Sequence, residues 1–78
     1  MRVVGTIPHP QIRITVFHMN DKFIVKFEAG PMEQTLKFAQ EDVGGVEAIQ
    51  ERLTDEILQR IVARFHEMMA DAKVIAGR

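Results

Sequence analysis

The sequence predicts a single α+β domain over residues 1–78, in which an antiparallel meander of three strands, or four, is packed on one face by C-terminal helices. Two segments of alternating apolar and polar residues flank Asn20 and Asp21, and a third follows Gly30. After residue 45 the apolar residues recur at steps of three and four, which is typical of an amphipathic helix. Together these patterns indicate a half-buried sheet covered by helix.

The N-terminal segment contains Pro8 and Pro10 on either side of His9. Proline lacks the amide donor that a central strand needs, so this segment is predicted to be a loop or an edge. The pattern leaves open whether residues 2–7 add a short fourth strand at the edge of the sheet.

Residues 11–19 and 22–29 are predicted to pair as a hairpin, because Asn20 and Asp21 tolerate the positive φ of a two-residue turn. The core-facing pairs are then Ile14 with Phe27, Val16 with Val25 and His18 with Phe23. The outer-face pairs are Arg13 with Glu28, Thr15 with Lys26 and Phe17 with Ile24. A slip by one residue would send the apolar side chains to opposite faces, which favours this register.

The second strand is predicted to end at Gly30-Pro31, in a four-residue loop over residues 29–32, because Gly-Pro is a poor pair for a tight hairpin. The third strand then places Leu36 opposite Val25 on the core face. Residues 40–45 form a polar, glycine-containing break.

From Val46 onward the chain forms either one long helix or two consecutive helices with a break near Leu53 and Thr54. Thr54 followed by two acidic residues is typical of a helix N-cap, which favours the break. Gly77 is a natural stop. The predicted core consists of Ile14, Val16, Phe23, Val25, Phe27, Leu36, Phe38, Ile49, Leu53, Ile57, Ile61 and Phe65.

Composition excludes several classes of function. The chain has no cysteine, which rules out disulfides and thiolate zinc sites. Its net charge of −1 gives no global field to attract nucleic acid or an anionic membrane. No apolar run approaches the roughly 20 residues of a membrane-spanning helix, and the N-terminus lacks the apolar region of a signal peptide. These features predict a cytoplasmic protein without membrane association.

The sequence predicts no catalytic residue, no metal site and no cofactor. His9, His18 and His66 do not follow the spacing of metal ligands, and His18 is expected to be partly buried and hydrogen-bonded. Glu47, Glu51 and other carboxylates of the helical segment are expected to form a solvated stripe. The pattern therefore favours a non-enzymatic protein.

The favoured function is a small interaction domain that self-associates as a homodimer. A domain of 78 residues without disulfides is marginally stable, and oligomerisation is one way to stabilise it. Apolar residues are expected to gather on the outer sheet face and on the part of the helix that overhangs the sheet. The candidate interface consists of Phe17, Met19, Ile24, Phe65, Met68 and Met69.

Two alternatives use the same outer face. Phe17 would stack on a base of single-stranded nucleic acid while basic side chains hold the phosphates; these are Arg13, Lys22, Lys26 and Lys37. In the other alternative the N-terminal segment, through Val3, Val4 and Ile7, folds over Phe17 and Ile24 within the same chain. The net acidic charge disfavours the first alternative.

The run IPHPQIRITVFHMNDKFIVKFEAGPMEQTLKF resembles a group of short uncharacterised bacterial proteins. These share an N-terminal IPHP segment, a hairpin rich in Ile, Phe and Lys, an EQT-type third strand and a helical C-terminus. The resemblance covers nearly the whole chain and implies neither an activity nor any site residue.

Overall fold

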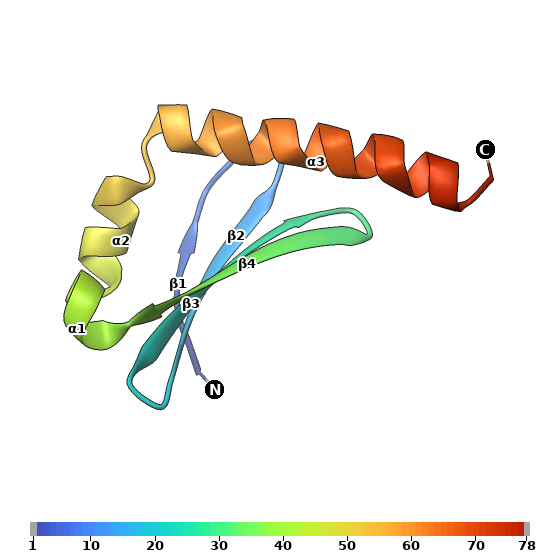
Figure 1. Ribbon diagram of the computed structural model, residues 1–78. Helices are drawn as coiled ribbons and strands as arrows, with labels where there is room; N and C mark the ends of the chain where they lie inside the picture. Colours follow the sequence, from blue (N-terminus) through green and yellow to red (C-terminus); the bar gives the residue numbers. More distant parts are fainter. Residues whose placement is uncertain (1, 78) are drawn as a thin grey trace.

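The computed structural model describes residues 2–77 and confirms the α+β class (Figure 1). Four strands form one antiparallel sheet in the order β1-β2-β3-β4, so residues 2–7 do add a fourth strand. The strands are β1 (Arg2–Ile7), β2 (Arg13–Met19), β3 (Lys22–Ala29) and β4 (Met32–Ala39). The helices that follow are α1 (Gln40–Val43), α2 (Val46–Arg52) and α3 (Asp55–Ile75). Of these, α1 lies in the segment predicted to be a polar break.

The hairpin of β2 and β3 has the predicted register, with Val16 opposite Val25 and Met19 opposite Lys22. Asn20 and Asp21 have φ of 51° and 60°, so both central residues of the turn are left-handed. This is the requirement of a type I′ turn, whose twist matches that of the flanking strands. The turn and the apolar alternation therefore specify the same pairing.

The connection between β3 and β4 differs from the prediction. Ala29 pairs with Met32, which leaves a two-residue turn of Gly30 and Pro31 in place of the four-residue loop. Gly30 has φ of 59°, which suits the first central position of a type II′ turn, and the proline ring supplies a negative φ at the second. The predicted pairing of Val25 with Leu36 is confirmed. The two-residue turn and the four-residue loop are centred on the same residues, so both give the same strand register.

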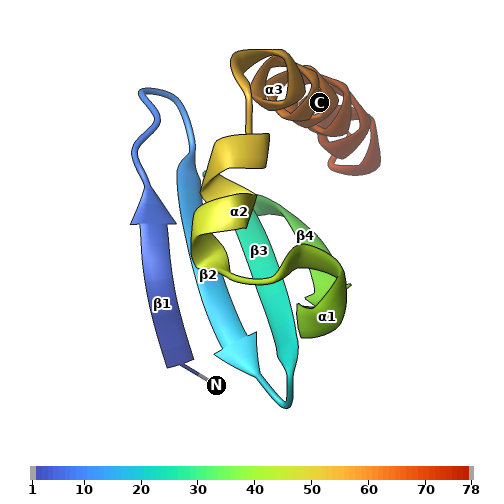
Figure 2. The same ribbon diagram turned by 90° about the vertical axis from the view of Figure 1, so that its left-hand side faces the viewer.

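Strand β1 pairs with β2 and extends the sheet in its own plane (Figure 2). The interpretation that this segment folds over Phe17 and Ile24 is therefore wrong. The register shifts between Val3 and Gly5, which marks a β-bulge. At Gly5 an added Cβ would lie 3.1 Å from Cγ2 of Val46, so glycine allows α2 to approach the strand closely.

The predicted break in the helical segment is confirmed. α2 ends at Arg52, Leu53 leaves helical geometry with ψ of 72°, and α3 begins at Asp55. Thr54 is the N-cap of α3, and its Oγ1 accepts a hydrogen bond from the backbone N–H of Ile57 at 3.4 Å. The two helices consequently run in different directions, with α2 over the sheet and α3 across one end of it (Figures 1 and 2).

The core lies between the sheet and these helices. Its buried residues are Ile12, Ile14, Val16, Phe23, Val25, Phe27, Ile49, Leu58, Ile61 and Phe65. Of the predicted core residues, Phe38, Leu53 and Ile57 are only partly buried. Leu36 was predicted to be buried but is 47% exposed, because it lies on the β4 side of the core face, beside the gap between α2 and α3.

Truncation of Phe27 to alanine should destabilise the domain by roughly 3–5 kcal/mol, because the side chain is 1% exposed and a cavity would remain. Val74→Ala is the matched control, since Val74 is 78% exposed and its change should be close to zero. The measurement is urea denaturation at one fixed protein concentration. Equal effects of the two substitutions would contradict this description of the core.

Loss of the Thr54 cap in Thr54→Ala should lower the free energy of unfolding by about 1 kcal/mol, since the N–H of Ile57 loses its acceptor. Thr54→Ser keeps the hydroxyl and should retain most of the stability. The two variants are compared by thermal and urea unfolding. A Thr54→Ala variant as stable as the parent chain would show that the hydroxyl does not cap α3.

Candidate functional site

The structure does not bring the six candidate interface residues together. Phe65 is 3% exposed and belongs to the core, so it is not available to a second copy. Ile24 is also buried, although it lies on the outer face. Met19 and Met69 are exposed, but Met19 ends β2 at the end of the sheet far from α3, which carries Met69 (Figure 1). Phe17 and Met68 are half-buried.

The outer sheet face carries charges of both signs. Nζ of Lys26 lies 3.1 Å from Oε2 of Glu33 on the neighbouring strand. The hydrogen bond and charge of Glu33, assisted by the charge of Glu28, raise the pKa of Lys26 above its ordinary value. Glu28 and Glu33 are themselves directly opposite each other. This part of the face is therefore an alternating charge cluster and offers no continuous track for phosphates.

His18 is half-buried and hydrogen-bonded, as predicted. Its Nε2 lies 2.9 Å from Oε1 of Gln40, the first residue of α1. Its ring is tilted against Phe23, with 4.8 Å between the ring centroids. The histidine thus joins the end of the sheet to α1 and has a structural explanation.

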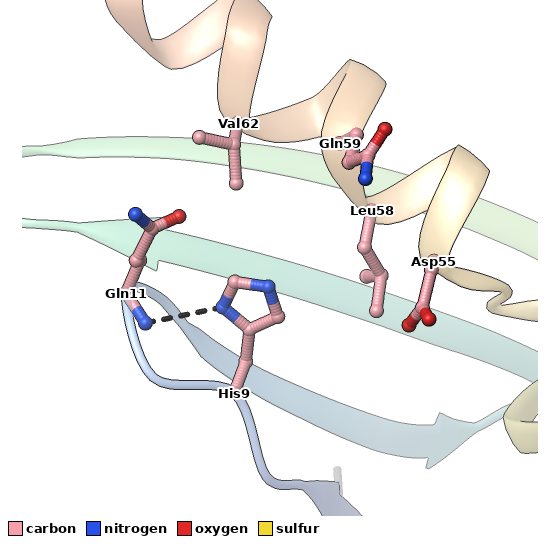
Figure 3. A pocket seen from close by; sticks show the side chains of 6 residues that line it. All are labelled: His9, Gln11, Asp55, Leu58, Gln59 and Val62. Carbon is pink, nitrogen blue, oxygen red and sulfur yellow. Dashed lines mark hydrogen bonds between the residues drawn. The ribbon is translucent and has the colours of Figure 1, made fainter.

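A small pocket lies between the loop after β1 and the start of α3 (Figure 3). Its volume is about 230 Å³, and it is lined by His9, Gln11, Asp55, Leu58, Gln59 and Val62. The backbone N–H of Gln11 donates a hydrogen bond to Nδ1 of His9 at 3.1 Å. This ring nitrogen therefore helps to stabilise the loop. These six side chains include no hydroxyl, thiol or amine, so the imidazole of His9 and the carboxylate of Asp55 are the groups that could act as a nucleophile, an acid or a base there.

Within residues 2–77 no group of three or more His, Cys, Asp or Glu side chains is placed to hold a metal ion. The carboxylates Glu47, Glu51 and Asp55 are all exposed, as expected, but Asp55 begins α3 and does not continue the stripe of Glu47 and Glu51 on α2. No helix within residues 2–77 is both long enough and apolar enough to cross a membrane.

The most apolar concave surface is a groove on the core side of β4. It has a volume of about 230 Å³ and lies between the sheet, α2 and the first turn of α3. Its lining residues are Val25, Phe27, Leu36, Phe38, Val43, Ile49, Arg52, Leu53 and Ile57. The groove exists because the chain bends at Thr54, so that α2 and α3 diverge beside β4 (Figure 1). Sequence patterning predicted seven of these nine residues as core, all except Val43 and Arg52, and missed the opening.

A second hollow continues along the free edge of β4. It is lined by Gln34, Thr35, Leu36, Ile57, Arg60, Ile61 and Arg64. The side-chain amide of Gln34 donates to the backbone carbonyl of Ile61 at 3.0 Å, which ties β4 to α3 at this point. Leu36 and Ile57 line both hollows, so the exposed apolar surface runs from the groove to the strand edge.

No family model, curated protein or solved structure matches this chain.

Proposed function

We propose that this chain is a non-catalytic interaction domain that self-associates as a homodimer through the β4 side of the sheet. The observation that carries the proposal is the apolar groove beside β4, where Leu36 is 47% exposed among other apolar side chains. Contiguous exposed apolar surface on a small domain typically marks a contact with another molecule. This location replaces the outer face as the favoured interface.

The lining of the groove favours a protein partner over a small ligand. Its lining is apolar apart from Arg52 at one side, so it offers few groups to orient a ligand. A second copy that covers Leu36 would bury apolar surface, and each Å² buried would stabilise the dimer by roughly 25 cal/mol.

A second copy is also the partner that supports the domain itself. The described chain has no disulfide and no metal cluster to stabilise its small core. Binding between folded copies stabilises the folded state by mass action. Self-association therefore provides the stabilisation that a domain of this size usually needs.

The parent chain should sediment as a dimer, at twice its mass of 8.9 kDa, across a micromolar dilution series. Leu36→Asp should shift it toward monomer, because a carboxylate would have to be buried in the apolar contact. Val74→Asp is the control, on an exposed apolar residue outside the groove, and should leave the dimer unchanged.

Phe17→Ser tests the outer face in the same experiment and should also leave the mass unchanged. A parent chain that stays monomeric throughout the series would refute the proposal. Dissociation by Phe17→Ser, with Leu36→Asp still dimeric, would move the interface to the outer face.

A further inference from the structure

The two edges of the sheet differ in how open they are to another strand. β1 has a bulge between Val3 and Gly5, a feature that blocks strand addition. β4 pairs with β3 at every position from Met32 to Ala39 without a bulge, and Pro31 lies in the turn before it. β4 is therefore the edge that can accept another strand.

The phase of the β3–β4 ladder determines which backbone groups point outward. In a two-residue turn the closing pair, here Ala29 and Met32, is hydrogen-bonded. Hydrogen-bonded and non-hydrogen-bonded pairs alternate along an antiparallel ladder. Glu33, Thr35 and Lys37 are therefore the residues whose N–H and C=O groups point away from β3.

We propose that two copies of this chain pair β4 with β4, antiparallel, about a two-fold axis at Thr35. This inference rests on the proposed homodimer and specifies its geometry. Thr35 then faces the partner's Thr35, while Glu33 faces the partner's Lys37 and Lys37 faces the partner's Glu33. The outward backbone groups of all three residues form hydrogen bonds across the axis, and the two sheets become one of eight strands.

The charges select this register. A two-fold axis perpendicular to the sheet keeps the outer-face residues of both copies on the same face of the joined sheet. Registers with the axis at different β4 residues therefore differ only in which side chains are opposite each other. An axis at Glu33 or at Lys37 places two like charges directly opposite each other, which destabilises strand pairing. An axis at Gln34 or at Leu36 leaves both charges without an opposite partner. The axis at Thr35 matches both charges at once.

Lys37 is the outer-face cation that this register brings into an ion pair. Within one copy Arg13 lies opposite Glu28, and Nζ of Lys26 lies 3.1 Å from Oε2 of Glu33, so each carboxylate already has a cation nearby. Lys37 is exposed, and no ion pair to it is present within residues 2–77. In the dimer each Lys37 would gain the partner's Glu33 as an opposite charge.

On the core side the same register covers the exposed leucine. Leu36 would face the partner's Gln34, and Phe38 would face the partner's Met32, which closes the apolar groove. Arg60 and Arg64 line the edge on this side, and both copies would bring theirs toward the axis. Glu56 and Glu67 lie one helical turn from Arg60 and Arg64 in the sequence, a spacing at which oppositely charged side chains can interact.

Charge reversal tests the register. Glu33→Lys alone and Lys37→Glu alone should each weaken self-association roughly tenfold, because two attractive cross-strand pairs become repulsive. An equimolar mixture of the two variants should regain the dimer, since one chain then carries two cations on the edge and the other two carboxylates. Native mass spectrometry with one variant labelled with nitrogen-15 identifies the mixed dimer.

A cysteine placed on the axis gives a second readout. Residues in a hydrogen-bonded antiparallel pair have Cα atoms about 5.5 Å apart, within the range of a disulfide. Thr35→Cys should therefore form a disulfide-linked dimer in oxidised glutathione, and the natural chain contributes no other thiol. Thr6→Cys, exposed on the opposite edge strand, is the control and should stay unlinked.

The outcomes separate this inference from the function on which it rests. A monomeric parent chain would overturn both. A dimeric parent chain whose association neither reversal weakens, with Thr35→Cys linking no faster than Thr6→Cys, would overturn β4 pairing and leave the dimer to another surface. If a charge variant fails to fold by circular dichroism, the cysteine pair decides the result.

Discussion

The left-handed backbone at Asn20 and Asp21 is the local constraint on which the rest of the structure depends. With φ of 51° and 60° these two residues allow a turn whose twist matches that of the strands, and they fix which residues of β2 and β3 are opposite each other. Val16 and Val25 consequently point to the same face and are both fully buried there. A register displaced by one residue would send one of them to solvent and leave α2 and α3 without an apolar surface to cover.

Much of the fold could be predicted from the sequence because its signals are local. Period-two alternation gives the strands and their faces, and Thr54 with its acidic neighbours gives the start of α3. The length of the Gly30-Pro31 turn was mispredicted because the prediction treated Gly-Pro as a poor pair for a tight hairpin. It did not consider that glycine with a positive φ fits the first central position of a type II′ turn. α1 has only four residues, too few for a periodic pattern to show.

The site was less predictable because apolarity in a sequence does not say what covers a residue. Leu36 alternates as a core residue should and does lie on the core face, yet no helix covers it. Phe65 was predicted both as core and as part of the candidate interface; the core prediction is confirmed, and burial under α3 removes it from the interface. Both outcomes depend on the directions in which α2 and α3 run relative to the sheet. The spacing of apolar residues along a helix does not determine the direction of that helix.

The bend at Thr54 links the fold to the proposed assembly. It lets the helical segment follow the sheet and bury Ile49, Leu58, Ile61 and Phe65, and it also separates α2 from α3 beside β4. The gap lies next to the sheet edge without a bulge, and that edge carries Glu33 and Lys37 symmetrically about Thr35. An edge with a self-complementary charge pattern, bordered by uncovered apolar surface, has the properties expected of a contact with a second copy.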